Sequence, residues 1–172
     1  MRFILIIYFG LFIGERVSGQ TVDNSIGNIK TYVKTTDSLT KTRYVSSMSE
    51  GSIKSTKKRG REGRGFSRTT VTSVDSDTVY LIRQHDNLEK NLTQSYYFKS
   101  DKLVFCRIEV QDDDNVNATL FRQEEYYKDD KVILSTVDKN ELKKKYKRRT
   151  DFDHMANGYY YLKDYKNGRP SN

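Results

Sequence analysis

The chain contains few of the residues that most often crosslink a small protein or carry out catalysis. Its 172 residues include one cysteine, one proline, two histidines and no tryptophan. The single cysteine, Cys106, excludes an internal disulfide, so the fold has to be held by packing alone. Pro170 is the one proline, so strand and helix interiors before it are free of that breaker. With only His85 and His154, acid–base or metal chemistry has few candidates.

Tyrosine and positive charge are the resources that the chain does have. It contains 13 Tyr and 8 Phe, with 35% hydrophobic and 31% charged residues and a mean hydropathy of −0.82. A tyrosine packs its ring while its hydroxyl stays hydrated, which suits half-buried sheet faces. The length fits one domain with accessory segments. The formal net charge of +8 favours contact with anionic polymers or surfaces.

The N-terminus has the order of a signal peptide. Arg2 is followed by the apolar run Phe3–Ile13 and then by small residues before Gln20. This order predicts a signal peptide over residues 1–19, cleaved between Gly19 and Gln20. The run is shorter than the roughly 20 residues that span a bilayer, so no transmembrane span would remain after cleavage. The alternative is a buried N-terminal strand or helix. Export predicts a periplasmic, cell-envelope or secreted protein.

Cleavage would change the charge only slightly. It removes two arginines and one glutamate, which takes the formal net charge from +8 to +7. The exported chain would therefore stay basic.

Two accessory segments follow the leader. Residues 20–45 carry Val22, Ile26, Ile29 and Val33 at helical spacing, which predicts a helix with one apolar stripe. Residues 46–68 are rich in Ser, Gly, Lys and Arg and offer little to bury, so they predict a mobile loop or a weak edge hairpin.

From residue 69 onward, short β-rich runs alternate with turn clusters. This pattern predicts an antiparallel β domain over residues 69–172. The expected strands lie near 69–74, 78–84, 92–98, 103–111, 119–127 and 131–137. The expected turns include Asp75–Asp77, His85–Asn87 and Lys99–Asp101.

One short phrase occurs twice, as SYYFKSDKLVF at 95–105 and as EYYKDDKVIL at 125–134. Each copy predicts a hairpin tip, in which tyrosines end one strand, KSDK or KDDK makes the turn, and an apolar run begins the next strand. Ser and Asp suit the turn because their side chains bond nearby backbone, and Asp tolerates positive φ. A lysine after the turn stays solvated and discourages edge pairing.

Alternation of side chains along the strand near 103–111 predicts that its two faces differ in polarity. Val104, Cys106, Ile108 and Val110 would share an apolar face, while the opposite face runs from Leu103 and Phe105 to Arg107 and Glu109. The sheet is therefore expected to be covered on one face and half wet on the other.

The C-terminal region predicts one helix and one further hairpin. Leu142, Tyr146, Arg149 and Phe152 lie at helical intervals and predict a short basic helix. YYYLKDYKNGRP at 159–170 reads as a looser third copy of the hairpin phrase. The expected fold class is α+β: an antiparallel sheet of successive hairpins with an N-terminal helix and a short C-terminal helix.

This tyrosine, turn and apolar-strand phrase resembles bacterial MORN-like hairpin-repeat proteins and related small secreted proteins of unassigned role. The resemblance covers residues 95–135 and, more loosely, 159–169, where Tyr165–Arg169 matches best. The glycine of the repeat turn is replaced by Asp101 in one copy and by Asp130 in the other. The resemblance implies a scaffold or interaction surface built of hairpins and brings no catalytic residues.

One segment has the spacing of a calcium loop. Asp113, Asn115, Asn117 and Glu124 occupy positions 1, 3, 5 and 12 of that pattern. Ala118 replaces the glycine that makes the sharp turn, and the preceding residues predict a strand where the motif needs a helix. We expect a polar hairpin loop, no metal and no cofactor.

Two basic patches could contact an anionic polymer such as nucleic acid or an anionic glycan. Such binding would weaken steeply with salt, and the alternative is a solvated loop and a charged helix face. The first patch, 54–68, contains Lys57, Lys58, Arg59, Arg61 and Arg64. The second, 143–149, contains Lys143, Lys144, Lys145, Arg148 and Arg149.

Enzymatic residues are few, and we expect a protein that is not an enzyme. Asp151, Asp153 and His154 could meet a metal, but a helix cap and a surface histidine explain them equally well. Cys106 on an apolar strand face is more often a small buried side chain than a nucleophile. The sequence thus predicts an exported, non-catalytic binding or structural module with an unidentified protein or envelope partner. The alternative function is polyanion binding through the two basic patches.

Overall fold

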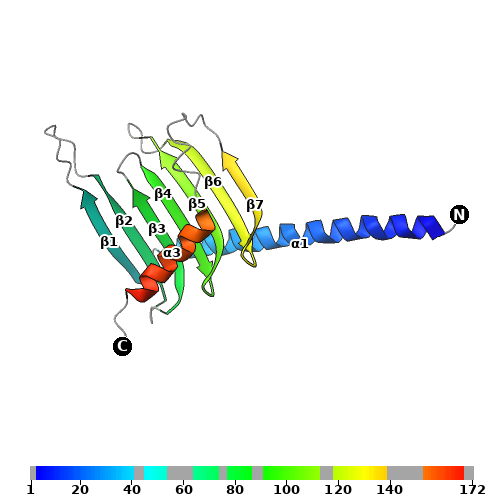
Figure 1. Ribbon diagram of the computed structural model, residues 1–172, viewed down its shortest axis with the longest axis horizontal. Helices are drawn as coiled ribbons and strands as arrows, with labels where there is room; N and C mark the ends of the chain where they lie inside the picture. Colours follow the sequence, from blue (N-terminus) through cyan, green and yellow to red (C-terminus); the bar gives the residue numbers. More distant parts are fainter. Residues whose placement is uncertain are drawn as a thin grey trace.

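The computed structural model describes most of the chain in seven stretches. These are residues 3–40, 45–53, 64–73, 77–86, 91–112, 118–138 and 153–168. They form one antiparallel sheet of seven strands, flanked by two helices (Figure 1). In chain order the elements are α1 (Phe3–Leu39), β1 (Val45–Ile53), β2 (Arg64–Thr72), β3 (Val79–Asp86), β4 (Leu92–Lys99), β5 (Lys102–Gln111), β6 (Thr119–Lys128), β7 (Lys131–Asp138) and α3 (His154–Asn167).

The strands lie side by side in the order of the sequence, from β1 to β7, and every neighbouring pair is antiparallel. This confirms the α+β class, with an antiparallel sheet of successive hairpins and a helix at each end. The six strands expected after residue 69 all occur near their predicted positions. The expected turn at His85–Asn87 is wrong for His85, because β3 continues to Asp86 and the ring Nδ1 of His85 lies 3.0 Å from Oγ1 of Thr93 on β4.

The edge-hairpin reading of residues 46–68 agrees with the structure, and the loop reading does not. Val45–Ile53 pairs along its whole length with Arg64–Thr72. Only residues 54–63, which lie outside the described residues, separate the two strands. Serines, threonines and glycines pair here because cross-strand backbone hydrogen bonds need no apolar side chain.

The repeated phrase builds the same hairpin twice. Ser100 and Asp101 have φ values of 51° and 60°, and Asp129 and Asp130 have values of 50° and 57°. Positive φ at both central residues makes a two-residue type I′ turn, whose twist matches that of the flanking strands. The predicted hairpin tips at KSDK and KDDK are confirmed.

Each of these hairpins also contains one extra residue after its turn. Tyr97 pairs with Phe105 but Phe98 pairs with Leu103, so Val104 is a bulge. This overturns part of the expected face pattern. Leu103 packs with Cys106 on one face, while Val104 packs on the other, because the extra residue reverses the alternation. The same shift between Tyr126 and Tyr127 makes Ile133 the bulge of the second hairpin.

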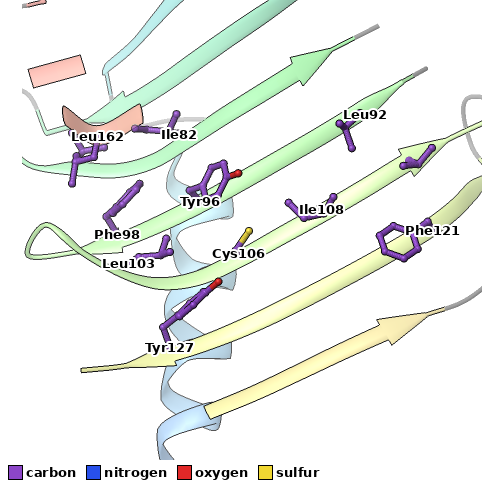
Figure 2. Close-up of a cluster of buried hydrophobic side chains, with 12 residues drawn as sticks. Ile82, Leu92, Tyr96, Phe98, Leu103, Cys106, Ile108, Phe121, Tyr127 and Leu162 are labelled. Atoms are coloured by element: carbon purple, nitrogen blue, oxygen red, sulfur yellow. The ribbon is translucent and has the colours of Figure 1, made fainter. Parts of the chain in front are cut away.

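One face of the sheet is covered by α3. Fully buried Tyr96, Phe98 and Ile108 form the centre of this core, and Leu162 of α3 packs on them (Figure 2). Gly158 lets the helix approach closely, since a Cβ at this position would lie 2.9 Å from Cδ1 of Tyr96. We call this the α3 face.

The opposite face, which we call the α1 face, is covered by the C-terminal half of α1. Val33 is buried there, and Ile26 and Ile29 pack with it against Tyr97 and Phe105. This confirms the predicted apolar stripe for Ile26, Ile29 and Val33, but Val22, its first member, is exposed. The expectation that only one face would be covered is wrong, because each face carries a helix. Figure 1 shows the N-terminal half of α1 projecting beyond the sheet.

The third hairpin predicted at 159–170 is wrong, because residues 159–167 belong to α3. Asp153 caps the helix by accepting a 2.9 Å hydrogen bond from the amide of Ala156. Met155, Tyr159 and Leu162 then fall at helical spacing and face the sheet. The C-terminal helix predicted around residues 142–152 lies outside the described residues.

Candidate functional site

A cleft of about 400 Å³ lies on the α1 face, between α1 and strands β5 and β6. Its wall and floor come from segments far apart in the sequence. Val33 anchors the wall, because its side chain is buried against the sheet and thereby holds the polar residues on either side of it at the cleft. The cleft is lined by Lys30, Val33, Lys34 and Asp37 of α1, Phe105 and Arg107 of β5, and Glu124 and Tyr126 of β6.

The floor combines an ion pair with two aromatic rings. Arg107 and Glu124 are direct cross-strand partners, and Nε of Arg107 lies 2.9 Å from Oε1 of Glu124. The hydroxyl of Tyr126 donates a 3.1 Å hydrogen bond to Oε2 of the same carboxylate. The rings of Phe105 and Tyr126 meet edge to face, with centroids 4.9 Å apart. Every oxygen of the Glu124 carboxylate therefore already accepts a hydrogen bond.

The tyrosine in the floor stays protonated far into the alkaline range. Burial, and then the nearby Glu124 carboxylate, raise the pKa of Tyr126 to about 12. Its hydroxyl is therefore a hydrogen-bond donor at neutral pH, and the floor gains no negative charge from it.

The helical wall supplies one tethered carboxylate and two lysines. Oδ1 of Asp37 accepts a 2.7 Å hydrogen bond from the hydroxyl of Tyr97 and lies 3.7 Å from Arg83. The ammonium of Lys30 stands 5.8 Å above the ring of Tyr126. Lys34, one helical turn further on, is exposed and has no ion-pair partner among the described residues. The cleft thus presents two lysines that form no ion pair within the part of the chain that the structure describes.

This arrangement can hold an anionic group. Three cationic side chains face two carboxylates, and both carboxylates are engaged by hydrogen bonds. An anionic group could sit against Lys30 and Lys34 while a small attached apolar body lies in the cleft above Phe105 and Tyr126, whose rings are almost fully buried in the floor. The lining contains no serine, threonine, cysteine or histidine.

The sequence-predicted catalytic candidates lie on the other side of the sheet. Cys106 is buried in the α3-face core, and burial, with Glu125 nearby, raises the pKa of its thiol well above the usual value. A thiol kept protonated in this way is a poor nucleophile. His154 is the first residue of α3 and is buried, so the expectation of a surface histidine is wrong.

The metal readings find no support among the described residues. Asp153 serves as the N-cap of α3, as the helix-cap alternative predicted, and Asp151 lies outside the described residues. No group of three or more His, Cys, Asp or Glu side chains that could hold a metal occurs within the stretches that the structure describes.

The calcium-loop prediction also loses the glutamate expected at position 12 of the loop. Glu124 lies within strand β6 and pairs with Arg107. Strands β5 and β6 stand where a calcium loop needs helices. Asp113, Asn115 and Asn117 lie outside the described residues.

Most of the predicted polyanion contacts also lie outside the described residues. These are Lys57, Lys58, Arg59, Arg61, Lys143, Lys144, Lys145, Arg148 and Arg149. Arg64 begins β2. Arg68, at the end of the first patch, is committed to internal contacts, since it pairs with Asp164 at 2.5 Å and lies over the ring of Tyr161. Polyanion binding stays a prediction.

The predicted cleavage site falls within a helix. Gly19 and Gln20 lie in the backbone of α1. Among the described residues, neither α1 nor α3 has the combination of length and apolar character that crossing a membrane demands. The cleavage itself stays a prediction.

The cleft was not found from the sequence. Lys30 and Lys34 lie on either side of Val33 in the sequence of α1. This pattern could have predicted positive charge beside the apolar stripe of the helix. The register that sets Arg107 opposite Glu124 could not be read, because it depends on the length of the β5–β6 connection. Comparisons with protein families, with curated proteins and with solved structures give no match for this chain.

Proposed function

We propose that this chain is an exported, non-catalytic binding module of the cell envelope or extracellular space, and that its ligand site is the cleft on the α1 face. The observation that carries the proposal is the pairing of Lys30 and Lys34 with an aromatic floor whose carboxylate is already satisfied. Such a site attracts a negative charge and offers apolar contact beside it. The ligand class is an anionic group on a flat apolar body.

The size of the cleft fits this ligand class. Its volume of about 400 Å³ falls within the range of about 300–1,000 Å³ typical of small-molecule sites. Phe105 and Tyr126 are buried and pack edge to face beneath the cleft, and the Arg107 guanidinium pairs with Glu124. The floor is therefore largely formed before a ligand arrives, which lowers the entropic cost of binding.

The non-catalytic part of the proposal rests on the lining itself. The lining contains no serine, threonine, cysteine or histidine, and its two carboxylates each accept a hydrogen bond from a tyrosine. Both oxygens of Glu124 accept hydrogen bonds within the floor, which leaves this carboxylate poorly placed to act as a general base.

The export part rests on the leader-like N-terminus and on the shape of α1. Loss of residues 1–19 would remove a part of α1 that projects beyond the sheet, and it would leave Ile26, Ile29 and Val33 in place (Figure 1). The test is the intact mass of the protein recovered from envelope and secreted fractions of its own host. A mass matching residues 20–172 supports export, and an intracellular protein that retains residues 1–19 refutes it.

The binding test compares three probes by heteronuclear NMR titration. Phenylacetate carries both the anion and the ring, phenylacetamide lacks the charge, and acetate lacks the ring. We expect phenylacetate alone to shift the amide signals of Lys30, Lys34, Arg107 and Tyr126 in a saturable way. Equal shifts from all three probes, or shifts scattered over the surface, would contradict the proposal.

A matched pair of variants locates the charge. Lys34→Gln removes one cation from the cleft, and we expect it to weaken phenylacetate binding about three- to tenfold. Lys163→Gln changes an exposed lysine of α3, on the other side of the sheet, and should leave the affinity unchanged. If both variants bind equally well, the cleft is not the site.

A further inference from the structure

Strand β7 forms an edge of the sheet. Its inner side pairs with β6, and within the residues that the structure describes no strand lies on its outer side. Its sequence, KVILSTVD, is rich in β-branched residues and contains neither glycine nor proline. Val132 and Val137 are 52% and 43% exposed, which places them among the exposed large hydrophobic residues of the described chain. The strand thus presents backbone hydrogen-bonding groups together with apolar side chains.

The register with β6 assigns each β7 side chain to a face. Val132 stands opposite Tyr127, and Ser135 stands opposite Glu125, whose carboxylate accepts from Tyr127. Both β7 residues therefore lie on the α3 face. Val137 stands opposite Gln123, which donates to Glu125, so Val137 belongs to the same face.

The remaining β7 residues lie on the α1 face. Leu134 and Thr136 stand opposite Tyr126 and Glu124, both of which line the cleft. Lys131 and Asp138 begin and end the strand on this face. Ile133 is the bulge, so it interrupts the alternation between Val132 and Leu134.

The order of side chains along β7 is self-complementary when two copies of the strand run antiparallel. In an antiparallel pair of two β7 strands centred on Ser135, Leu134 stands opposite Thr136, and, with the bulge residue skipped, Val132 stands opposite Val137. Lys131 then stands opposite Asp138. Every facing pair comes from one face, as antiparallel pairing about a two-fold axis through the sheet demands. Without the bulge, the valines could not face each other.

We propose that β7 pairs antiparallel with β7 of a second copy of this chain, which joins two sheets into one. Charge complementarity identifies the occupant: the lysine at the start of each strand meets the aspartate at the end of the other, twice per dimer. The two valine pairs would cover each other on the α3 face. Because the interface uses the same patch on both subunits, the assembly closes as a dimer.

Charge-reversal variants test this by analytical ultracentrifugation of the full chain over a range of concentrations. Lys131→Asp puts two aspartates opposite each other at both ends, and Asp138→Lys does the same with lysines. We expect each variant alone to dimerise at least about tenfold more weakly than the wild type. An equimolar mixture of the two should dimerise again, because every pair is then Asp opposite Lys. Lys102→Asp, at the equivalent position of the first hairpin, should dimerise like the wild type.

A cysteine pair gives an independent readout. Ser135→Cys would meet its own copy at the axis, at the Cα separation of about 4.5–5.5 Å that suits a disulfide. Thr136→Cys would meet Leu134 instead. Under mild oxidation we expect a disulfide-linked dimer from the first variant and little from the second. A wild type that stays monomeric, a mixture that does not recover, or equal cross-linking of the two cysteine variants would overturn the proposal.

Discussion

The hydroxyl of Tyr97 donates a 2.7 Å hydrogen bond to Oδ1 of Asp37, across 60 positions of sequence. Tyr97 is fully buried on the central strand β4, and Asp37 belongs to the last turns of α1. The bond therefore fixes the helical wall of the cleft to the middle of the sheet.

Removing the two partners of this bond should have unequal effects on stability. Asp37→Ala leaves the buried Tyr97 hydroxyl without an acceptor, and we expect a loss of about 1–3 kcal/mol in the free energy of unfolding. Tyr97→Phe removes the hydroxyl itself and should cost about 0.5–1.5 kcal/mol. Asp37→Asn keeps an acceptor oxygen and should be the mildest. Urea denaturation measures all three.

The control for this series is Asp23→Ala, at an exposed position on α1. Its effect should stay within about 0.5 kcal/mol. If Asp37→Ala is as mild as Asp23→Ala, the hydrogen bond does not hold the helix to the sheet.

Two glycines should respond in opposite directions to alanine. A Cβ at Gly158 would lie 2.9 Å from Cδ1 of Tyr96 and 3.3 Å from Cδ2 of Leu103, both buried. We expect Gly158→Ala to destabilise the protein by about 1–2 kcal/mol, since overpacking outweighs the gain in helix propensity. Gly27 has no atom within 4 Å of that position, so Gly27→Ala should stabilise by about 0.5–1 kcal/mol. Thermal unfolding separates the two, and equal gains would contradict the close approach of α3.

The hairpin turns should gain stability from glycine at selected positions. Ser100 and Asp129 are exposed and hold positive φ, which costs a non-glycine residue free energy. Ser100→Gly and Asp129→Gly should each raise the free energy of unfolding by about 0.5–1 kcal/mol.

The neighbouring positions provide the comparison for these turn variants. Asp101 pairs with Lys166, and Asp130 accepts a 2.5 Å hydrogen bond from the hydroxyl of Tyr159. Glycine there relieves the same strain but loses the contact, so it should gain less. Equal gains at all four positions would show that the contacts to α3 contribute nothing.

The protein should lose stability in alkali because of its tyrosines. Burial raises the pKa of Tyr96, Tyr97 and Tyr127, and it raises that of Tyr126 to about 12. Above the ordinary pKa of 10.0 the unfolded chain loses these protons while the folded protein keeps them. The unfolded state then binds fewer protons, so the free energy of unfolding falls as the pH rises.

The contribution of these tyrosines should be fully present below about pH 10 and should decline as the pH rises toward and beyond about 12. Urea unfolding at several pH values measures this decline, and absorbance at 295 nm follows tyrosinate. Tyr126→Phe should make the decline less steep by up to one proton. A flat profile across this interval would contradict the raised pKa values.

Short-range features of the sequence determined much of the sheet. The turns KSDK and KDDK combine residues that accept positive φ with flanking β-rich runs, so both hairpins could be predicted from a few adjacent residues. The apolar stripe from Ile26 to Val33 likewise predicted the helix that packs on the sheet. These signals are local, and their geometry does not depend on what lies across the molecule.

Only the tertiary structure determined which segments and side chains pack against each other. The segment YYYLKDYKN at 159–167 contains tyrosines that suit a strand or a helix, and it is helical because Leu162 and Gly158 of α3 fit the surface formed by Tyr96 and Leu103. The bulge at Val104 placed both Leu103 and Val104 on the faces opposite to those that simple alternation predicts. The cleft brings the Arg107–Glu124 pair of two neighbouring strands together with Lys34 of α1. Such relationships are set by long-range packing and register, which adjacent residues do not encode.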